Sequence, residues 1–171
     1  MRLARSAAAV LAFAGLIALG ARMAMPMVPV PMTMQTFAVL LAGAVLGPWR
    51  GAAAALLYLA AAAAGLPVLS DGASGLAPFA GPTAGYLFAF PVAALLVGLS
   101  ARRGRFDQPL EGFITLYSVH IFILSLGAVW LAREIGLSRA MEVGWAPFLV
   151  GAVVKSALVL LAERPLRGLK P

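Results

Sequence analysis

The sequence lacks most of the side chains from which metal centres and nucleophilic active sites are built. Its 171 residues include no cysteine and a single histidine, His120. The absence of cysteine excludes a disulfide framework, a thiolate nucleophile and a cysteine-based metal site, and one histidine alone does not make a histidine-based metal site. A nucleotide-binding lysine loop is also missing, so any ATP hydrolysis must come from a partner. We expect neither a bound metal nor a cofactor.

Charged side chains are also scarce, at 11% of the chain, whereas 63% of the residues are hydrophobic and the mean hydropathy is +0.98. Soluble domains contain about 25% charged and roughly 45–50% apolar residues. The composition therefore excludes a soluble globular enzyme, a disordered chain and a collagen. The 18 glycines suit membrane helices, which pack closely through small residues. We predict an integral membrane protein that lies in the lipid bilayer.

Six apolar runs bounded by prolines, glycines or charged residues are candidates for spanning helices, which need about 20 mostly apolar residues. The predicted spans cover approximately residues 6–24, 33–47, 50–66, 82–100, 112–132 and 146–163. Between the first two, the prolines of Met25–Pro31 predict an extended segment, because proline cannot donate to a helix. We therefore predict a single all-α domain of six transmembrane helices over residues 1–171.

A second interpretation of the first span stays open. Arg2 and Arg5 precede an apolar run and then small residues, as in a signal peptide. Its removal would leave five spans.

The basic residues lie at the ends of the apolar runs, so the net charge of +7 does not indicate nucleic-acid binding. Lys and Arg are enriched in cytoplasmic loops. With the N-terminus inside, nine of them lie on the inner side and three on the outer side. We therefore expect both termini in the cytoplasm of a bacterium, with the chain in its inner membrane. The Pro-rich segment and the loops 68–81 and 133–145 would then share the outer side.

Lys155 is the one basic residue inside a predicted span. A lysine at the centre of a spanning helix costs about 2.5–3.5 kcal/mol on insertion scales and marks a functional position by default. No other predicted span offers a carboxylate to pair with it. This favours a cavity in which the ammonium meets an anionic ligand. The alternative is a helix displaced in depth, with Lys155 near an interface.

The segment Val68–Gly81 is the second candidate for a binding element. It has no helical periodicity, and Asp71, Ser74 and Gly75 offer polar groups and free backbone. Non-helical backbone at membrane depth is tolerated where it lines a cavity. The alternative is an ordinary solvent-exposed connector.

Three further polar residues lie within predicted spans or at the start of one. Gln35 and Thr36 begin the second predicted span, where they either cap the helix or face a ligand. His120 lies in the middle of the fifth span without a second histidine or a nearby acid. We interpret it as a packed, hydrogen-bonded residue.

Several stretches in order resemble the biotin transporter family BioY, the substrate-binding S components of energy-coupling factor (ECF) transporters. They run through nearly the whole chain and comprise Pro29–Thr36, Gly65–Val68, Gly81–Leu87, and Pro147–Leu149 followed by Lys155. Each stretch is short, and it is their ordered combination that is specific.

The resemblance implies a six-helix S component that binds biotin from the outer side and is not an enzyme. It implies that Lys155 meets the valerate carboxylate of biotin and that the loop with Asp71 covers the ligand. Gly85 and Tyr86 would lie beside the apolar bicyclic ring.

The resemblance also implies partners. Ala14 and Ala18 match the small-residue motif of the first helix through which S components dock onto the transmembrane T component. Two ATPase subunits would complete that transporter. A solitary transporter, which would need no ATPase, stays open as an alternative.

One position departs from the family pattern. Ala152 stands three residues before Lys155, where family members usually have an aspartate that would accept hydrogen bonds from the ureido group. Loss of one such buried hydrogen bond costs about 1–3 kcal/mol. Biotin remains the leading ligand, and a related anionic vitamin or a biotin precursor is the alternative. A structural membrane protein without a ligand is the alternative from another class.

Overall fold

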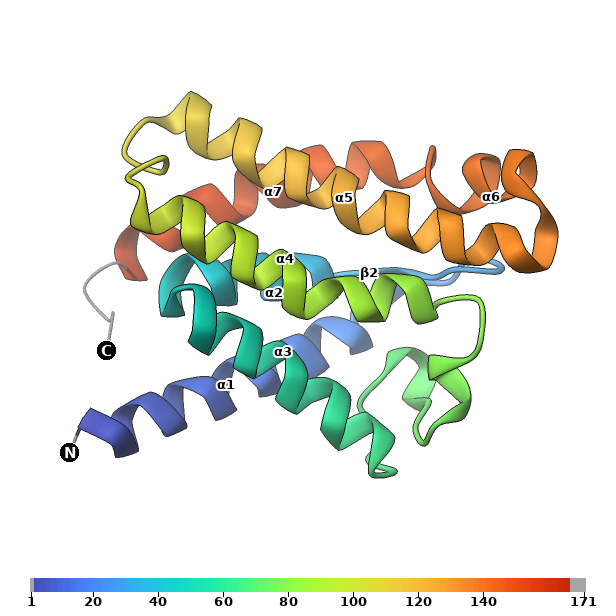
Figure 1. Cartoon of the computed structure of the whole chain (residues 1–171), viewed down its shortest axis with the longest axis horizontal. Helices are drawn as coiled ribbons and strands as arrows, with labels where there is room; N and C mark the ends of the chain where they lie inside the picture. The colour runs from blue at the N-terminus through green and yellow to red at the C-terminus, as the bar shows by residue number, and fades with distance from the viewer. Residues whose placement is uncertain (1, 167–171) are drawn as a thin grey trace.

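The computed structural model describes residues 2–166, which form six long helices and one short one (Figure 1). The predicted all-α class is confirmed, and each predicted span corresponds to one long helix. The helices are α1 (Arg2–Arg22), α2 (Gln35–Leu46), α3 (Pro48–Ala63), α4 (Ala84–Arg102), α5 (Pro109–Ile135), α6 (Leu137–Gly144) and α7 (Phe148–Leu166).

The helices differ in how well they match the thickness of a bilayer. Ala4–Arg22 of α1, the whole of α4 and the whole of α5 are each long and apolar enough to cross one. Helices α6 and α7 pass the same test together and are bent by 45° where they meet. Helix α2 has only 12 residues, fewer than the roughly 20 of a typical span.

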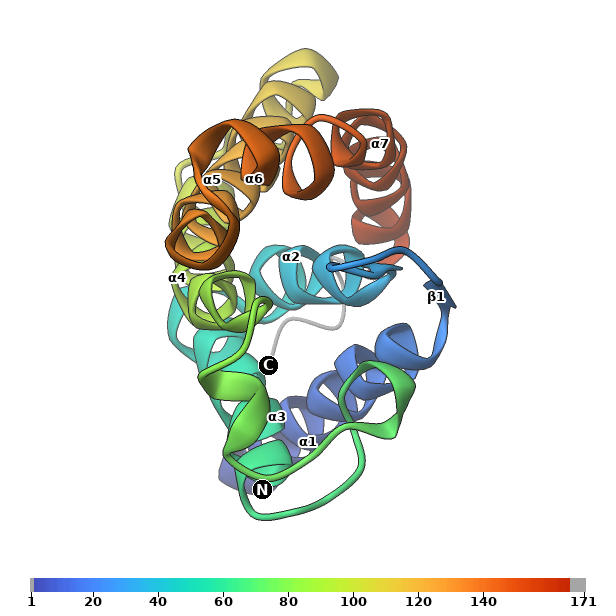
Figure 2. The same ribbon diagram turned by 90° about the vertical axis from the view of Figure 1, so that its right-hand side faces the viewer.

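Helix α2 lies at the centre of the bundle. It contacts α1, α3, α4 and α7, and Figure 2 shows it between α1 and α3 on one side and α5 and α7 on the other. Ten of its 12 residues are buried. Its apolar residues therefore pack against protein on nearly every face, as expected for a helix that is hydrophobic all round.

Glycines allow α2, α3 and α4 to approach one another closely. A Cβ atom on Gly43 of α2 would overlap the backbone carbonyl of Ala94 in α4, and one on Gly51 of α3 would overlap the backbone of Gly43. Small residues at such positions let membrane helices gain van der Waals contact. This packing lies at the end of the bundle where the chain turns from α2 into α3.

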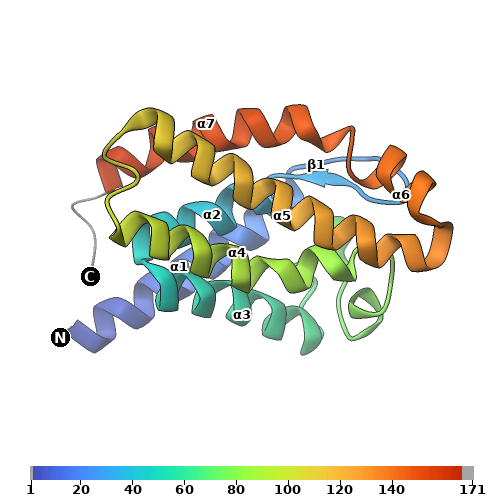
Figure 3. The same cartoon turned by 45° about the horizontal axis from the view of Figure 1, so that its top comes forward.

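The loops segregate to the two ends of the bundle (Figures 1 and 3). Both ends of the described chain and the turn between α4 and α5 lie at one end. The Pro-rich segment, the loop between α3 and α4, and α6 lie at the other, as expected from the six-span topology. The Pro-rich segment is extended, and its strands β1 (Ala24–Met25) and β2 (Met32–Thr33) pair antiparallel.

Two sequence expectations need correction or comment here. The segment 133–145 was expected to be a loop, but α5 continues to Ile135 and α6 follows at once after Gly136, which has a φ of +81°. Eight residues with a surface ion pair between Arg139 and Glu142 are too few and too polar to register as a span. Helix α1 packs on α2 and α3 with Ile17 fully buried, which is the place that the six-span interpretation gives it.

Gly43→Ala should lower the thermal stability of the protein, because its methyl group would displace the backbone of α4. Extra methyl groups in a close-packed interior cost about 1–3 kcal/mol. Gly15→Ala is the matched control, since a Cβ there would have no atom within 4 Å. Melting temperatures of the two variants in one detergent test this, and equal values would contradict it.

Candidate functional site

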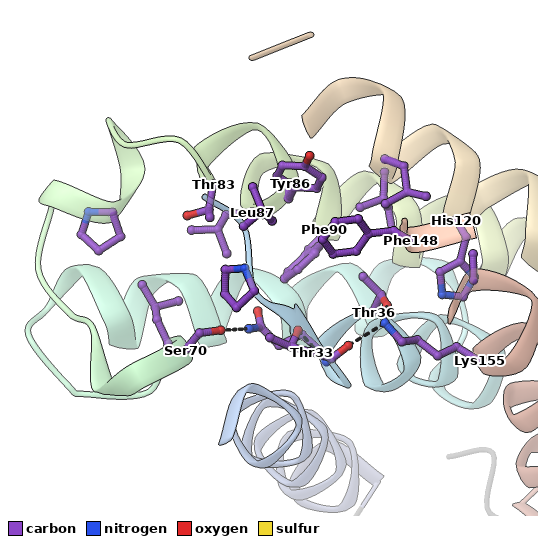
Figure 4. A pocket seen from close by; sticks show the side chains of 18 of the residues that line it. Thr33, Thr36, Ser70, Thr83, Tyr86, Leu87, Phe90, His120, Phe148 and Lys155 are labelled. Carbon is purple, nitrogen blue, oxygen red and sulfur yellow. Dashed lines mark hydrogen bonds between the residues drawn. The ribbon is translucent and has the colours of Figure 1, made fainter. Parts of the chain in front are cut away.

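A cavity of about 230 Å³ lies in the half of the bundle that carries the hairpin β1–β2 and the loop between α3 and α4 (Figure 4). The start of α2, the strand β2, that loop, and helices α4, α5 and α7 form its walls. Tyr86, Phe90 and Phe148 contribute aromatic surface, and a few polar side chains project among the apolar ones. This is the usual composition of a small-molecule site.

The structure brings most of the predicted binding residues to this cavity. Gln35, Thr36, Asp71, Tyr86, Ala152 and Lys155 line it, whereas Ser74, Gly75 and Gly85 do not. Their roles toward a ligand stay predictions.

The three residues outside the lining need a correction of placement. Gly85 faces α5, where a Cβ atom would overlap Trp130 and the backbone of Leu126. Successive helical residues lie about 100° apart, so Gly85 and its neighbour Tyr86 point in different directions. Gly75 donates its backbone N–H to the carbonyl of Ala62 over 2.8 Å, which ties that part of the loop, with Ser74, to the end of α3.

Lys155 projects from α7 into the cavity and is 9% exposed. Its Nζ donates to the backbone carbonyl of Thr33 over 2.6 Å and to Oγ1 of Thr36 over 3.2 Å. Both partners are uncharged, and an ammonium has three N–H bonds. The contact with Thr33, on strand β2, holds the ammonium inside the bundle.

Gln35 connects the first turn of α2 to the loop that covers the cavity. Its Nε2 donates to Oγ of Ser70 over 2.9 Å, and its Oε1 accepts from the hydroxyl of Tyr58 over 3.2 Å. The side chain does not cap α2. A second bond, from Nη2 of Arg22 to the carbonyl of Pro67 over 2.6 Å, ties the same loop to the end of α1.

Tyr86 offers its ring to the cavity, while its hydroxyl is engaged elsewhere. The hydroxyl donates to the carbonyl of Gly144 at the end of α6 over 2.6 Å. The ring lies where a Cβ atom of Gly127 on α5 would be. Tyr86 therefore supplies apolar surface to the cavity and fixes α6 to the bundle.

His120 is a lining residue that the sequence interpretation missed. It is hydrogen-bonded as expected, since Nδ1 lies 3.0 Å from Oγ of Ser156 and 3.2 Å from the carbonyl of Leu116. It also borders the cavity, which the sequence could not show, because the neighbours of a mid-span histidine come from another helix. Thr33 was likewise missed, because its backbone and not its side chain holds Lys155.

Asp71 has a left-handed backbone conformation, with a φ of +56°. Asp71→Ala should therefore loosen residues 66–81, since alanine in this conformation costs about 1–2 kcal/mol. Asp71→Gly is the matched control, because glycine adopts positive φ freely. Amide hydrogen exchange of residues 66–81 without ligand should be faster in the alanine variant than in the glycine variant. Equal acceleration in both would show that the carboxylate, and not the backbone, holds the loop.

Comparison with known proteins agrees with these features. The model of the BioY family matches residues 1–170. "Biotin transporter BioY" of Rhodobacter capsulatus is 39% identical in an alignment that covers 93% of this chain and 91% of that protein. "Probable biotin transporter BioY" of Pyrococcus horikoshii is 38% identical over 162 residues, which cover 94% and 96%. A crystal structure of the S-component for biotin from an ECF-type ABC transporter is similar with a TM-score of 0.87 and 28% identity, covering 98% of this chain and 93% of that one.

Proposed function

Since the chain belongs to the BioY family, we propose that it takes up biotin as the substrate-binding S component of an ECF-type ABC transporter. It is a transport protein and not an enzyme. The observation that carries the proposal is the cavity with Lys155, an intramembrane ammonium whose partners in the described structure are neutral oxygens. Biotin combines an apolar bicyclic ring with polar ends, which matches aromatic walls with a few polar groups.

The proposed orientation places both termini in the cytoplasm and the cavity toward the outside of a bacterial inner membrane. The short loop between α4 and α5 carries Arg103 and Arg105, and it lies at the same end as both ends of the described chain. Positive residues in short loops favour the cytoplasmic side. The hairpin, the loop over the cavity and α6 then face the outside, from which the vitamin comes.

A related anionic vitamin or a biotin precursor is the second candidate ligand. Ala152 lines the cavity beside Lys155 and brings only a methyl group, so this position makes no polar demand on a ligand. A precursor that lacks part of the bicyclic ring would keep the carboxylate and meet the same ammonium.

Lys155→Met should weaken biotin binding about 10- to 150-fold, because hydrogen bonds to charged groups contribute roughly 1.5–3 kcal/mol. The measurement is the shift in melting temperature of the purified protein on adding biotin. A ligand at a hundredfold excess over its dissociation constant stabilises the folded state by about 2.7 kcal/mol. No shift in either form, with biotin or a precursor, would favour a structural protein without a ligand.

Biotin whose carboxylate is converted to an amide shows which ligand atom Lys155 contacts. If Lys155 meets the valerate carboxylate, as the resemblance implies, wild type should bind the amide more weakly than biotin, and Lys155→Met should bind the two equally. Equal binding of both by wild type would place the ammonium against another oxygen of the ligand.

The docking surface for a T component needs a different set of residues from the expected one. Ala14 is buried in the core and Ala18 is half-buried against it, so this pair packs within the bundle. Among the small residues that α1 does expose, Ala8, Ala12 and Gly15 follow a helical spacing of four and three and so share one face. We propose that this face contacts the T component, which acts with two ATPase subunits.

Ala12→Leu should prevent copurification with coexpressed T and ATPase subunits while leaving biotin binding intact, because its bulk keeps the helices apart. Val154→Leu, at an exposed position of α7, is the control and should copurify normally. Copurification of both variants would contradict docking on this face. Failure of the wild type to copurify would favour a solitary transporter.

A further inference from the structure

His120 brings a polar atom without a partner to the wall of the cavity. The side chain is 2% exposed, and its Nε2 makes no hydrogen bond within residues 2–166. A buried polar atom left unpaired costs about 1–3 kcal/mol. His120 borders the cavity from α5, and Lys155 borders it from α7 (Figure 4). Because Nε2 itself has under 1 Å² of accessible surface, a ligand in the cavity pairs with it after a small shift of the ring toward the cavity.

The partners of the other ring nitrogen assign the tautomer. Nδ1 lies 3.2 Å from the carbonyl oxygen of Leu116, and a carbonyl oxygen can only accept. Nδ1 therefore carries the proton, and the Ser156 hydroxyl, 3.0 Å away, can accept from it as well. In a neutral imidazole with a protonated Nδ1, the Nε2 atom is an acceptor.

On the side of the cavity that α5 and α7 form, His120 and Lys155 are the two polar lining residues. Lys155 can only donate, and Ala152 and Phe148, which line the cavity from the same helix, are apolar. His120 thus adds an acceptor to a wall whose other strong polar group is a donor. Together they suit a ligand group that presents an oxygen and an N–H, as amides and ureas do.

We propose that His120 is a specificity-determining residue that contacts the ligand, with its Nε2 accepting a hydrogen bond from a ligand N–H. This rests on the proposed function, and in biotin the donor is a ureido N–H. A carboxylate against Nε2 would bring two acceptors together. The N–H edge of the ligand's ring therefore faces His120 and its ureido oxygen faces Lys155, in place of the valerate carboxylate that the resemblance implies for Lys155. Equal binding of biotin and its amide by wild type is the result expected here.

Substitution of His120 by asparagine or glutamine tests the two ring nitrogens separately, because the amide of each can replace one of them. The amide of asparagine reaches the position of Nδ1 and can keep the bonds to Ser156 and Leu116, but it lacks a group at Nε2. The amide of glutamine reaches the position of Nε2. We expect His120→Asn to bind biotin about 5- to 150-fold more weakly than wild type, and His120→Gln to bind it more tightly than His120→Asn. Melting temperatures without ligand show whether each variant is folded.

Biotin methylated at one or the other ureido nitrogen provides the matching change in the ligand. One methylated form should lose affinity for wild type, and this loss should be much smaller for His120→Asn, because coupled partners do not have additive effects. Binding of biotin to His120→Asn with wild-type affinity would overturn the proposal, and so would equal methylation penalties in both proteins. Should His120→Asn not fold, full affinity of wild type for both methylated forms would overturn it.

The same series distinguishes failure of this inference from failure of the proposed function. If wild type binds biotin and Lys155→Met does not, the proposed function stands whatever the histidine variants do. If wild type binds no biotin, the assignment of biotin falls, and the role of His120 toward a ureido group falls with it.

Discussion

The contact between the Lys155 ammonium and the carbonyl of Thr33 is the constraint around which the half of the protein with the cavity is arranged. A cation at membrane depth must be solvated by the protein, and helices offer few free carbonyls, because their backbone groups pair with one another. Thr33 lies on strand β2, outside any helix, so its carbonyl is available to Lys155 at 2.6 Å. The prolines of the preceding segment keep that stretch out of the helix.

The same break in the helix creates the cavity. Because α2 begins only at Gln35 and has 12 residues, the centre of the bundle is not filled by a helix at the end that carries the hairpin β1–β2. The hairpin and the loop between α3 and α4 close the space above it. At the opposite end, by contrast, Gly43 and Gly51 bring α2, α3 and α4 into direct backbone contact. The protein is thus tightly packed at one end and hollow at the other.

The helices and the intramembrane cation were predictable from the sequence, because both depend on local chemistry. Apolar runs and prolines mark the long helices, and a lysine inside such a run stands out without any knowledge of its neighbours. Helix α6 was missed because a short, polar helix produces no apolar run. Its start is nevertheless marked by Gly136, which ends α5 in a conformation that favours glycine.

Which face of each helix points to the core, the cavity or the surface was not predictable from the sequence in the same way. Ala14 and Ala18 were expected on the surface and Gly85 in the cavity, but small residues occur on all sides of these helices. Which side faces the core depends on partners far away in sequence. His120 shows this most clearly, since its role depends on Ser156, which is 36 residues away and fixes the direction of its ring.

The division into a packed and a hollow half also determines which part of the molecule can open. The loop over the cavity is joined to neighbouring elements by a few hydrogen bonds, from Gln35 to Ser70, from Arg22 to the carbonyl of Pro67, from Gly75 to the carbonyl of Ala62, and from Trp130 to the carbonyl of Gly81. Single hydrogen bonds contribute only about 0.5–1.5 kcal/mol net. Separating the glycine-packed helices would instead expose a large interior surface. Opening at the loop therefore requires far less free energy than opening between α2, α3 and α4. The loop is therefore the part of the cavity wall that opens most easily.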